Sequence, residues 1–284
     1  MNQEREQSYS LSDNDFDFIC QYTYELTGIV LSQKKREMVY RRLTRIIRER
    51  KLPSFTAYCD LLKQKAVQEQ SYFINKITTN LTSFYRESHH FDYLLQHELP
   101  RLLQKGLFKD RIRIWSCASS TGEEPYSIAM SLMESLGHRI SHNDVKVLAT
   151  DIDSNVLATA KKGVYETRKI DELPIKLQQR YFQKGLGENA NHVRVNPRLR
   201  ELITFKELNL LDEWPMKGLF DVIFCRNVII YFDKTTQEQL FARLYETLKP
   251  GGLLILGHSE NLGSYQQYFD NVGRTIFRKP TVNT

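Results

Sequence analysis

The sequence predicts an α/β protein in which an all-helical N-terminal domain precedes a larger domain built on a mostly parallel sheet. Three observations predict this class. Residues 13–76 carry apolar positions at helical spacing. From residue 111 onward, short apolar runs alternate with amphipathic helical segments, as in βα units. Residues 164–206 interrupt this alternation with scattered glycines and short β-like runs, which indicates a small antiparallel insertion.

The N-terminal helices are predicted from capping residues and apolar spacing. A first helix begins after Ser12 or Asp13 and stops at Gly28. A second helix spans 33–50, and Pro53 follows its end. The apolar positions of this second helix lie on one face and are Val39, Leu43, Ile46 and Ile47. Shorter helices are expected at 55–62 and 72–77.

The second helix also carries the basic character of the chain. Residues 34–51 contain nine basic and two acidic side chains, a net charge of +7, whereas the whole chain has a net charge of +6. Arg41, Arg45 and Arg48 fall within about 60° of one another on the side opposite the apolar face. This arginine face is either an ordinary solvated surface or a recognition surface for an acidic helical partner, and the choice of arginine favours recognition.

Residues 78–88 lack periodicity and are interpreted as a connector that lies against the second domain. A helix is expected at 89–104. The remaining expected elements are strands at 111–116, 145–150, 203–207, 220–225, 253–257 and 272–278, helices at 125–136, 154–162 and 237–248, and a turn at 249–252.

Composition excludes several classes of protein. With 284 residues, of which 41% are hydrophobic and 26% charged, the chain is neither disordered nor fibrous. It has no apolar run near the roughly 18 residues needed to span a bilayer, and its first residues do not resemble a signal peptide. Its four cysteines form no CxxC pair, so we expect no zinc site, no disulfides, and a reducing cytoplasm. Nothing demands an oligomer, and we expect a monomer.

The loop after the first strand is expected to bind a ligand, because ligands bind beyond the carboxyl ends of parallel strands. Its one glycine, Gly122, excludes both the GxGxxG fingerprint and the phosphate-binding loop. Glu123 and Glu124 would repel phosphate and favour a cation. Glu124 is expected at the N-cap of the next helix, beside the cleft. Alternatively, both glutamates only stabilise the helix end through its dipole.

Asp151 follows the second strand, where an acidic residue can accept hydrogen bonds from both hydroxyls of a ribose. Alternatively, it is a plain helix cap, although Asp153 suits that role better. A nucleoside without phosphates that carries a cationic group describes S-adenosylmethionine. The Pro-Gly-Gly turn before an apolar strand also recurs in Rossmann-like methyltransferases.

Several segments together resemble one family, the CheR-type chemotaxis receptor methyltransferases. The matching segments are NLTSFYRE at 80–87, ASSTGEEPYS at 118–127, TDID at 150–153, FCRNVIIYFD at 224–233 and GHSEN at 257–261. The similarity runs in order from about residue 11 to residue 278. The pair STGEEPYS and CRNVxIYFD is specific to this family.

The resemblance implies a Rossmann-like class I methyltransferase domain with an N-terminal all-helical domain and a small antiparallel β insertion. The expected boundaries are 1–77 for the helical domain, 78–88 for a connector that contributes to the cofactor site, and 89–284 for the methyltransferase domain, with 164–206 inserted. The implied methyl donor is S-adenosylmethionine, which leaves as S-adenosylhomocysteine. The implied acceptors are glutamate side chains of membrane chemoreceptors, which become glutamyl methyl esters in chemotactic adaptation.

The resemblance also implies roles for individual residues. The residues that match the family's cofactor contacts are Asn80, Thr82, Arg86, Glu124, Asp151, Asn209, Leu210, Asn227 and Val228. Arg86 and Tyr231 are the candidates beside the reacting methyl group, although Tyr231 could instead be a packing residue at a strand end. The residues expected to bind the receptor substrate are Arg41, Arg42, Arg45 and Arg48. The insertion matches the family only in outline, so docking of a receptor C-terminal tail there is left open.

Two other functions remain possible at this point. A nucleic-acid methyltransferase would use the basic helix to contact phosphates. However, Asn227 is followed by Val-Ile-Ile-Tyr rather than by Pro-Pro-aromatic, and Tyr40 is the one aromatic residue in the basic segment, so we expect no nucleic-acid partner. A non-catalytic S-adenosylmethionine-binding adaptor is the second alternative. We expect a cytoplasmic enzyme that is recruited to membrane receptor clusters without inserting into the membrane.

Overall fold

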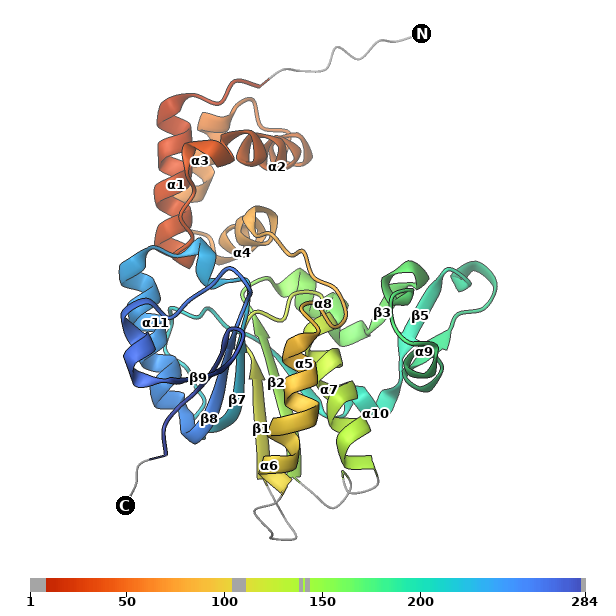
Figure 1. Ribbon diagram of the computed structural model, residues 1–284. Coiled ribbons are helices and arrows are strands. Elements are labelled where there is room, and N and C mark those ends of the chain that lie inside the picture. Colours follow the sequence, from red (N-terminus) through yellow and green to blue (C-terminus); the bar gives the residue numbers. More distant parts are fainter. Residues whose placement is uncertain (1–8, 104–110, 138–139, 141–143, 282–284) are drawn as a thin grey trace. The chain divides into compact units, whose positions relative to one another are not determined.

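The computed structural model describes residues 9–103, 111–137, 140 and 144–281, coloured along the chain in Figure 1. It divides into two compact units. The helical unit contains the chain up to Thr79 together with Tyr231–Asp233, and the sheet unit contains Asn80–Ile230 and Lys234–Thr284.

Between residues 9 and 79, the helical unit contains four α-helices and one short 3-10 helix. These are α1 (Asp13–Thr27), η1 (Gln33–Lys35), α2 (Arg36–Glu49), α3 (Phe55–Lys63) and α4 (Val67–Ile77). The predicted ends of α1 are confirmed, because the Ser12 side chain accepts a hydrogen bond from the Asp15 N–H and Gly28 takes the left-handed conformation.

The two faces of α2 are as the sequence predicts. Its apolar residues are fully buried in the core of the helical unit and are Val39, Leu43, Ile46 and Ile47. Arg41, Arg45 and Arg48 are exposed. Arg42 lies outside this face and is half-buried. Its guanidinium donates to the carbonyls of Ile77 and Thr78, at 2.5 and 2.7 Å, and so covers the C-terminal end of α4.

A seven-stranded sheet in the order β6-β2-β1-β7-β8-β10-β9 forms the centre of the sheet unit. The strands are β1 (Arg111–Ser116), β2 (Asp144–Asp151), β6 (Ile203–Glu207), β7 (Phe220–Cys225), β8 (Leu248–Leu256), β9 (Asp270–Gly273) and β10 (Ile276–Arg278). The first five in this order are parallel, and β10 runs antiparallel to both of its neighbours.

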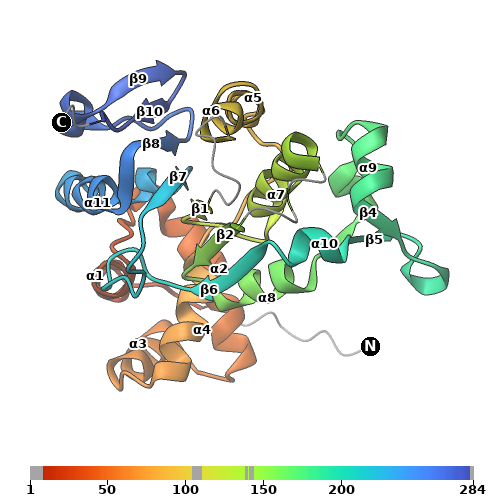
Figure 2. The ribbon, with the colours of Figure 1, turned by 90° about the horizontal axis from the view of Figure 1, so that it is seen from below.

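Helices cover both faces of the sheet, as Figure 2 shows. One face carries the segment α5 (His89–Tyr93), the π-helical turn η2 (Leu94–Glu98) and α6 (Leu99–Leu103), together with α7 (Glu123–Leu136) and α8 (Ser154–Lys162). The other face carries α11 (Lys234–Thr247). The predicted helix at 89–104 is therefore present up to Leu103, and Gln104 lies outside the described residues.

A three-stranded antiparallel sheet interrupts the alternation, which confirms the predicted insertion. Its strands are β3 (Val164–Glu166), β4 (Phe182–Lys184) and β5 (His192–Val195), and β5 is central. The short helical segments around them are η4 (Thr167–Ile170), α9 (Ile175–Tyr181), η5 (Gly187–Asn189) and α10 (Pro197–Arg200). Residues 203–206, at the end of the predicted insertion, lie in β6 of the main sheet.

Several local predictions are wrong, and the helix expected at 72–77 already begins at Val67, as α4. The helix α7 begins at Glu123 with Gly122 as its N-cap, because Gly122 takes a φ of 100° and comes too close to Ala160 and Tyr165 for any side chain. Residues 249–252 are the start of β8 and not a turn, since a register shift between β7 and β8 accommodates Pro250. The predicted last strand is a hairpin of β9 and β10, because Thr275 has a φ of 53°.

In the described parts of the chain, no helix combines the length and the apolar character that a membrane crossing needs.

Candidate active site

The chain leaves β1 and β7, two adjacent parallel strands, toward opposite faces of the sheet. After β1 it enters α7, and after β7 it reaches α11 through the turn η6 (Ile229–Tyr231). The N–H of Cys117 donates to the Phe224 carbonyl at 2.9 Å and keeps the two strand ends together. Such a topological switch point opens a ligand crevice beyond the carboxyl ends of the strands.

Asp151, the last residue of β2, is buried at this edge of the sheet. One carboxylate oxygen accepts a hydrogen bond from the Ser120 N–H at 2.8 Å, and the other accepts from the Asp153 N–H at 2.9 Å. Burial raises the pKa of Asp151 to about 6, and the two N–H groups oppose this rise. Each carboxylate oxygen can accept a further hydrogen bond, as a ribose diol requires.

Asn80 attaches the start of the connector to the same loops. Its side-chain amide donates to the Asp153 carboxylate at 2.8 Å, and its carbonyl accepts from the Ser120 hydroxyl at 3.0 Å. Asp153 also accepts from the N–H groups that open α8, which confirms its predicted role as the cap of that helix. Asn80 and Asp151 are thus brought together through Ser120 and Asp153.

Glu124 is buried and already has a cationic partner. Its carboxylate accepts hydrogen bonds from the Ser116 hydroxyl and from the Arg226 guanidinium, both at 2.7 Å. The Arg226 side chain is 1% exposed and lies over the Phe91 ring. Burial raises the pKa of Glu124, and the positive charge of Arg226 opposes this rise. Much of the negative charge that the sequence places beside the crevice is therefore balanced by Arg226.

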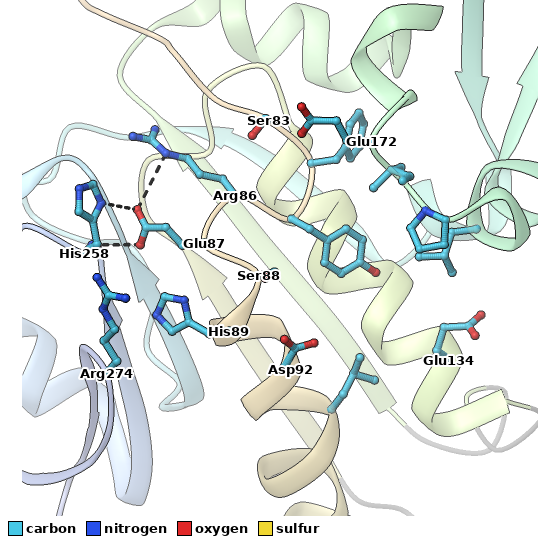
Figure 3. A pocket seen from close by; sticks show the side chains of 16 residues that line it. Ser83, Arg86, Glu87, Ser88, His89, Asp92, Glu134, Glu172, His258 and Arg274 are labelled. Atoms are coloured by element: carbon cyan, nitrogen blue, oxygen red, sulfur yellow. Dashed lines mark hydrogen bonds and ion pairs between the residues drawn. The ribbon is translucent and has the colours of Figure 1, made fainter.

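Glu87 connects the connector to the loops after β7 and β8. Its carboxylate accepts hydrogen bonds from both the backbone and the ring of His258, at 3.0 and 2.9 Å (Figure 3). It also accepts one from the Asn227 side-chain amide at 3.2 Å. Arg226 lies 3.4 Å away. Burial favours the neutral acid, but the His258 hydrogen bond and the charge of Arg226 prevail, and the pKa of Glu87 falls to about 2.

Arg86 lies beside Glu87, and its guanidinium donates to the Leu81 carbonyl at 2.8 Å. The Arg86 carbonyl accepts a hydrogen bond from Arg226, which places it in the same network as Glu124. Arg86 also lines a groove of about 970 Å³, with Glu172 and Asp92 among the other lining residues (Figure 3). Thr82 is half-buried in the same connector.

The remaining predicted cofactor contacts lie in two loops. Asn227 and Val228 follow β7, and Asn227 has a φ of 57°. Asn209 and Leu210 follow β6. The Leu208 N–H donates to the Asp151 carbonyl at 3.0 Å, which places this second loop beside the end of β2.

Five predicted site residues lie in the helical unit rather than in the sheet unit. Tyr231 ends η6, and its carbonyl accepts from the Val30 N–H at 2.8 Å. The other four are the arginines of α2, namely Arg41, Arg42, Arg45 and Arg48.

Sequence reasoning assigned no role to Arg226, Glu87 or Glu260, although all three occur in the quoted motifs. Arg226 and Glu87 join the predicted residues to one another, and Glu260 accepts hydrogen bonds from the backbone of Asn227 and Val228. A signal was present for Arg226, because an arginine directly after a mostly apolar, fully buried strand needs a buried partner.

The site suits S-adenosylmethionine better than a nucleotide with phosphates. The crevice loops combine a buried carboxylate able to bind a diol with a second buried carboxylate, Glu124, and contain no glycine-rich phosphate loop. Across the described ranges, no group of three or more His, Cys, Asp or Glu side chains is placed to hold a metal ion.

The strand order and these strand-end residues define a Rossmann-like class I methyltransferase domain. Residues 80–278 match the family model described as "CheR methyltransferase, SAM binding domain", and residues 14–78 match "CheR methyltransferase, all-alpha domain".

Curated relatives agree with this class over nearly the whole chain. The chain is 43% identical to chemotaxis protein methyltransferase 2 of Pseudomonas aeruginosa, with 95% of each chain covered. It is 44% identical to the chemotaxis protein methyltransferase of Salmonella typhimurium, with 95% of this chain and 92% of the relative covered. Identity to the protein of the same name from Escherichia coli is also 44%, with 94% and 91% covered. The chain belongs to the CheR methyltransferase family.

The raised pKa of Asp151 predicts that acid weakens cofactor binding. If Asp151 binds the ribose, its ionised carboxylate accepts the hydroxyl hydrogen bonds best, and protonation near pH 6 removes part of that capacity. Isothermal titration with S-adenosylhomocysteine should therefore give an affinity up to about tenfold weaker at pH 5 than at pH 7. Asp151→Asn should bind more weakly at pH 7 and lose much of this pH dependence, while the part due to Glu124, whose pKa is also raised by burial, remains. A wild-type affinity that is constant from pH 7 to pH 5 would contradict the assignment.

Proposed function

We propose that this chain transfers a methyl group from S-adenosylmethionine to glutamate side chains of membrane chemoreceptors. The products are glutamyl methyl esters and S-adenosylhomocysteine, and the activity is that of a protein-glutamate O-methyltransferase in chemotactic adaptation. The observation that carries the proposal is the match of both the helical and the cofactor-binding parts to proteins named chemotaxis protein methyltransferase.

In the proposed mechanism, this chain's residues bind and orient both reactants. Bound S-adenosylmethionine supplies an electrophilic methyl group on a sulfonium. Asp151 would accept hydrogen bonds from the ribose hydroxyls, and Glu124, together with its partner Arg226, would set the charge near the cationic end of the cofactor. Asn80 and Thr82 hold the cofactor from the connector. The loops after β6 and β7 close the crevice with Asn209, Leu210, Asn227 and Val228.

A glutamate acceptor fits a site that mainly positions its reactants. Glutamate has a pKa near 4.3 and is ionised at neutral pH, so its methylation needs no general base. The rate gain then comes from alignment of the reacting groups and exclusion of water. Arg86 orients a carboxylate at the reacting centre, and Tyr231 shapes the surroundings of the methyl group with its ring or hydroxyl.

Receptor recognition is assigned to the exposed arginine face of α2. Arg41, Arg45 and Arg48 project from one side of the helix, while the other side is buried in the core of the helical unit. Such a face complements an acidic helical surface of the receptor's cytoplasmic region and speeds encounter with it. Arg42 contributes through the structure of the helical unit, since its guanidinium is bound to the end of α4.

The insertion offers a second contact for receptors that carry a C-terminal tail. Its two edge strands, β3 and β4, have one free side each within the three-stranded sheet. A groove of about 510 Å³ lies there, lined by Val164, Leu186 and Arg194 among others. A peptide can add to such an edge through its backbone. Together these contacts would recruit a cytoplasmic monomer to membrane receptor clusters.

The linkage of the transferred methyl group tests the function directly. The protein is incubated with methyl-labelled S-adenosylmethionine and chemoreceptor-containing membranes, and the receptor band is then treated with mild base. Glutamyl esters should release the label as volatile methanol. Label that resists base would indicate N-methylation, label in nucleic acid would indicate the first alternative, and cofactor binding without transfer would indicate a non-catalytic adaptor.

Arg86 and Tyr231 should control turnover more than cofactor binding. We expect Arg86→Ala to lower kcat about 100-fold and Tyr231→Phe about tenfold, because both act on alignment at the reacting centre. The methanol-release assay gives kcat, and titration with S-adenosylhomocysteine gives Kd. Arg111→Ala, which removes an exposed arginine at the start of β1 and outside the insertion, is the matched control. Near-normal turnover in both test variants would make these roles wrong.

Charge reversal on α2 should affect the receptor and not the cofactor. Changing Arg41, Arg45 and Arg48 together to glutamate should raise the KM for receptor at least about tenfold and leave the KM for S-adenosylmethionine within about twofold. Raised salt should reduce the wild-type advantage. Reversal of Lys65, Lys162 and Lys217, which are also exposed, makes the same change in net charge and is the control. An unchanged receptor KM would exclude recognition by this face.

A further inference from the structure

Glu260 is a buried acidic residue whose partners are backbone N–H groups. It lies four residues after the end of β8 and is 6% exposed. One carboxylate oxygen accepts from Asn227 and Gly257, at 2.8 and 2.6 Å. The other accepts from Val228 and Ile229, at 2.9 and 2.8 Å, with the Ile230 N–H at 3.4 Å.

Four consecutive N–H groups of residues 227–230 therefore converge on one carboxylate. Successive backbone amides in such a curved loop form a concave anion-binding site. Here the anion belongs to the protein itself. Asn227 has a φ of 57°, a conformation that costs free energy in a residue with a side chain and persists when its surroundings hold it. At Asn227, the hydrogen bonds of this loop to the Glu260 carboxylate hold that conformation.

The backbone at Gly257, next to Glu260, has room for the Glu260 carboxylate only because position 257 is glycine. A side-chain carbon on Gly257 would lie 2.8 Å from the Glu260 carboxylate and 2.5 Å from the Asn227 amide nitrogen. The absence of a side chain at Gly257 therefore lets the Glu260 carboxylate contact the loop of residues 227–230. Burial raises the pKa of Glu260, and its N–H partners oppose that rise.

We propose that Glu260 is a positioning residue for the cofactor, because its carboxylate fixes the loop that carries Asn227 and Val228. The inference rests on the proposed assignment of Asn227 and Val228 as cofactor contacts. Glu260 itself acts through the loop, since its hydrogen bonds go to the backbone of residues 227–230 and 257. Asn227 in turn donates to Glu87 of the connector, so the same carboxylate also supports the connector's attachment.

The test compares Glu260→Gln with a matched buried acid. Glutamine has the same size but one acceptor oxygen, and its NH₂ group would face N–H donors. Asp221 is equally buried and accepts from the Arg113 N–H and from Lys249, toward the other end of β7. Titration with S-adenosylhomocysteine should give a Kd at least about tenfold higher for Glu260→Gln. Asp221→Asn should lower Tm and leave Kd within about twofold.

Two further measurements distinguish failure of the Glu260 proposal from failure of the proposed function. Asn227→Ala should weaken binding like Glu260→Gln. If Asn227→Ala weakens binding and Glu260→Gln does not, the positioning role is wrong and the cofactor assignment stands. If wild-type protein fails to bind S-adenosylhomocysteine, the proposed function fails instead. Should Glu260→Gln not fold, amide hydrogen exchange of the wild type decides. Strong protection of residues 227–230 supports the role, and exchange at exposed-loop rates overturns it.

Discussion

The rest of the site depends on the buried ion pairs and hydrogen bonds of the Arg226 guanidinium. It is almost fully buried, and it contacts Glu124 at the start of α7, the Arg86 carbonyl in the connector and Glu87 two residues before α5. A buried charge of this kind persists only with partners, and loss of one partner leaves an uncompensated charge in the interior. Arg226 thereby fixes three segments that are distant in sequence at the carboxyl edge of one sheet, namely the connector, the start of α7 and its own loop after β7.

The other charged residues of the site follow the same pattern. Asp151 is held by backbone N–H groups, Glu87 by His258 and Asn227, and Glu260 by the loop after β7. Groups fixed in this way need little reorganisation when a ligand arrives, which favours both binding and alignment. Four residues with side chains take positive φ values around this edge, namely Tyr85, Glu87, Ser120 and Asn227. Backbone strain of this kind is typical of functional sites.

Much of the fold could be predicted from the sequence, because apolar periodicity directly reports burial. The apolar face of α2 and the strands β1, β2 and β7 were located within a residue or two. The errors arose where backbone geometry overrode local pattern. Pro250 and the two glycines after it read as a turn, but a register shift draws them into β8.

The predicted site was limited in a different way. Strand-end positions identified Glu124 and Asp151, but pairing across 102 residues, as between Arg226 and Glu124, leaves no periodic signal in one sequence. The sequence also predicted the receptor-binding arginines of α2 only in part. Helical spacing placed Arg41, Arg45 and Arg48 on one face, and all three are exposed. Arg42 was expected to bind the receptor with them, but its guanidinium is hydrogen-bonded to the end of α4.

If the connector and the strand-end loops form a single S-adenosylmethionine site, both must contact the same bound ligand. A crystal structure of the chain with S-adenosylhomocysteine would show this. We expect ribose hydroxyls about 2.6–3.2 Å from the Asp151 carboxylate, contacts from Asn80 and Arg86, and an intact pair between Arg226 and Glu124. Ligand bound away from Asp151, or a connector that makes no contact with the ligand, would show that no such single site exists.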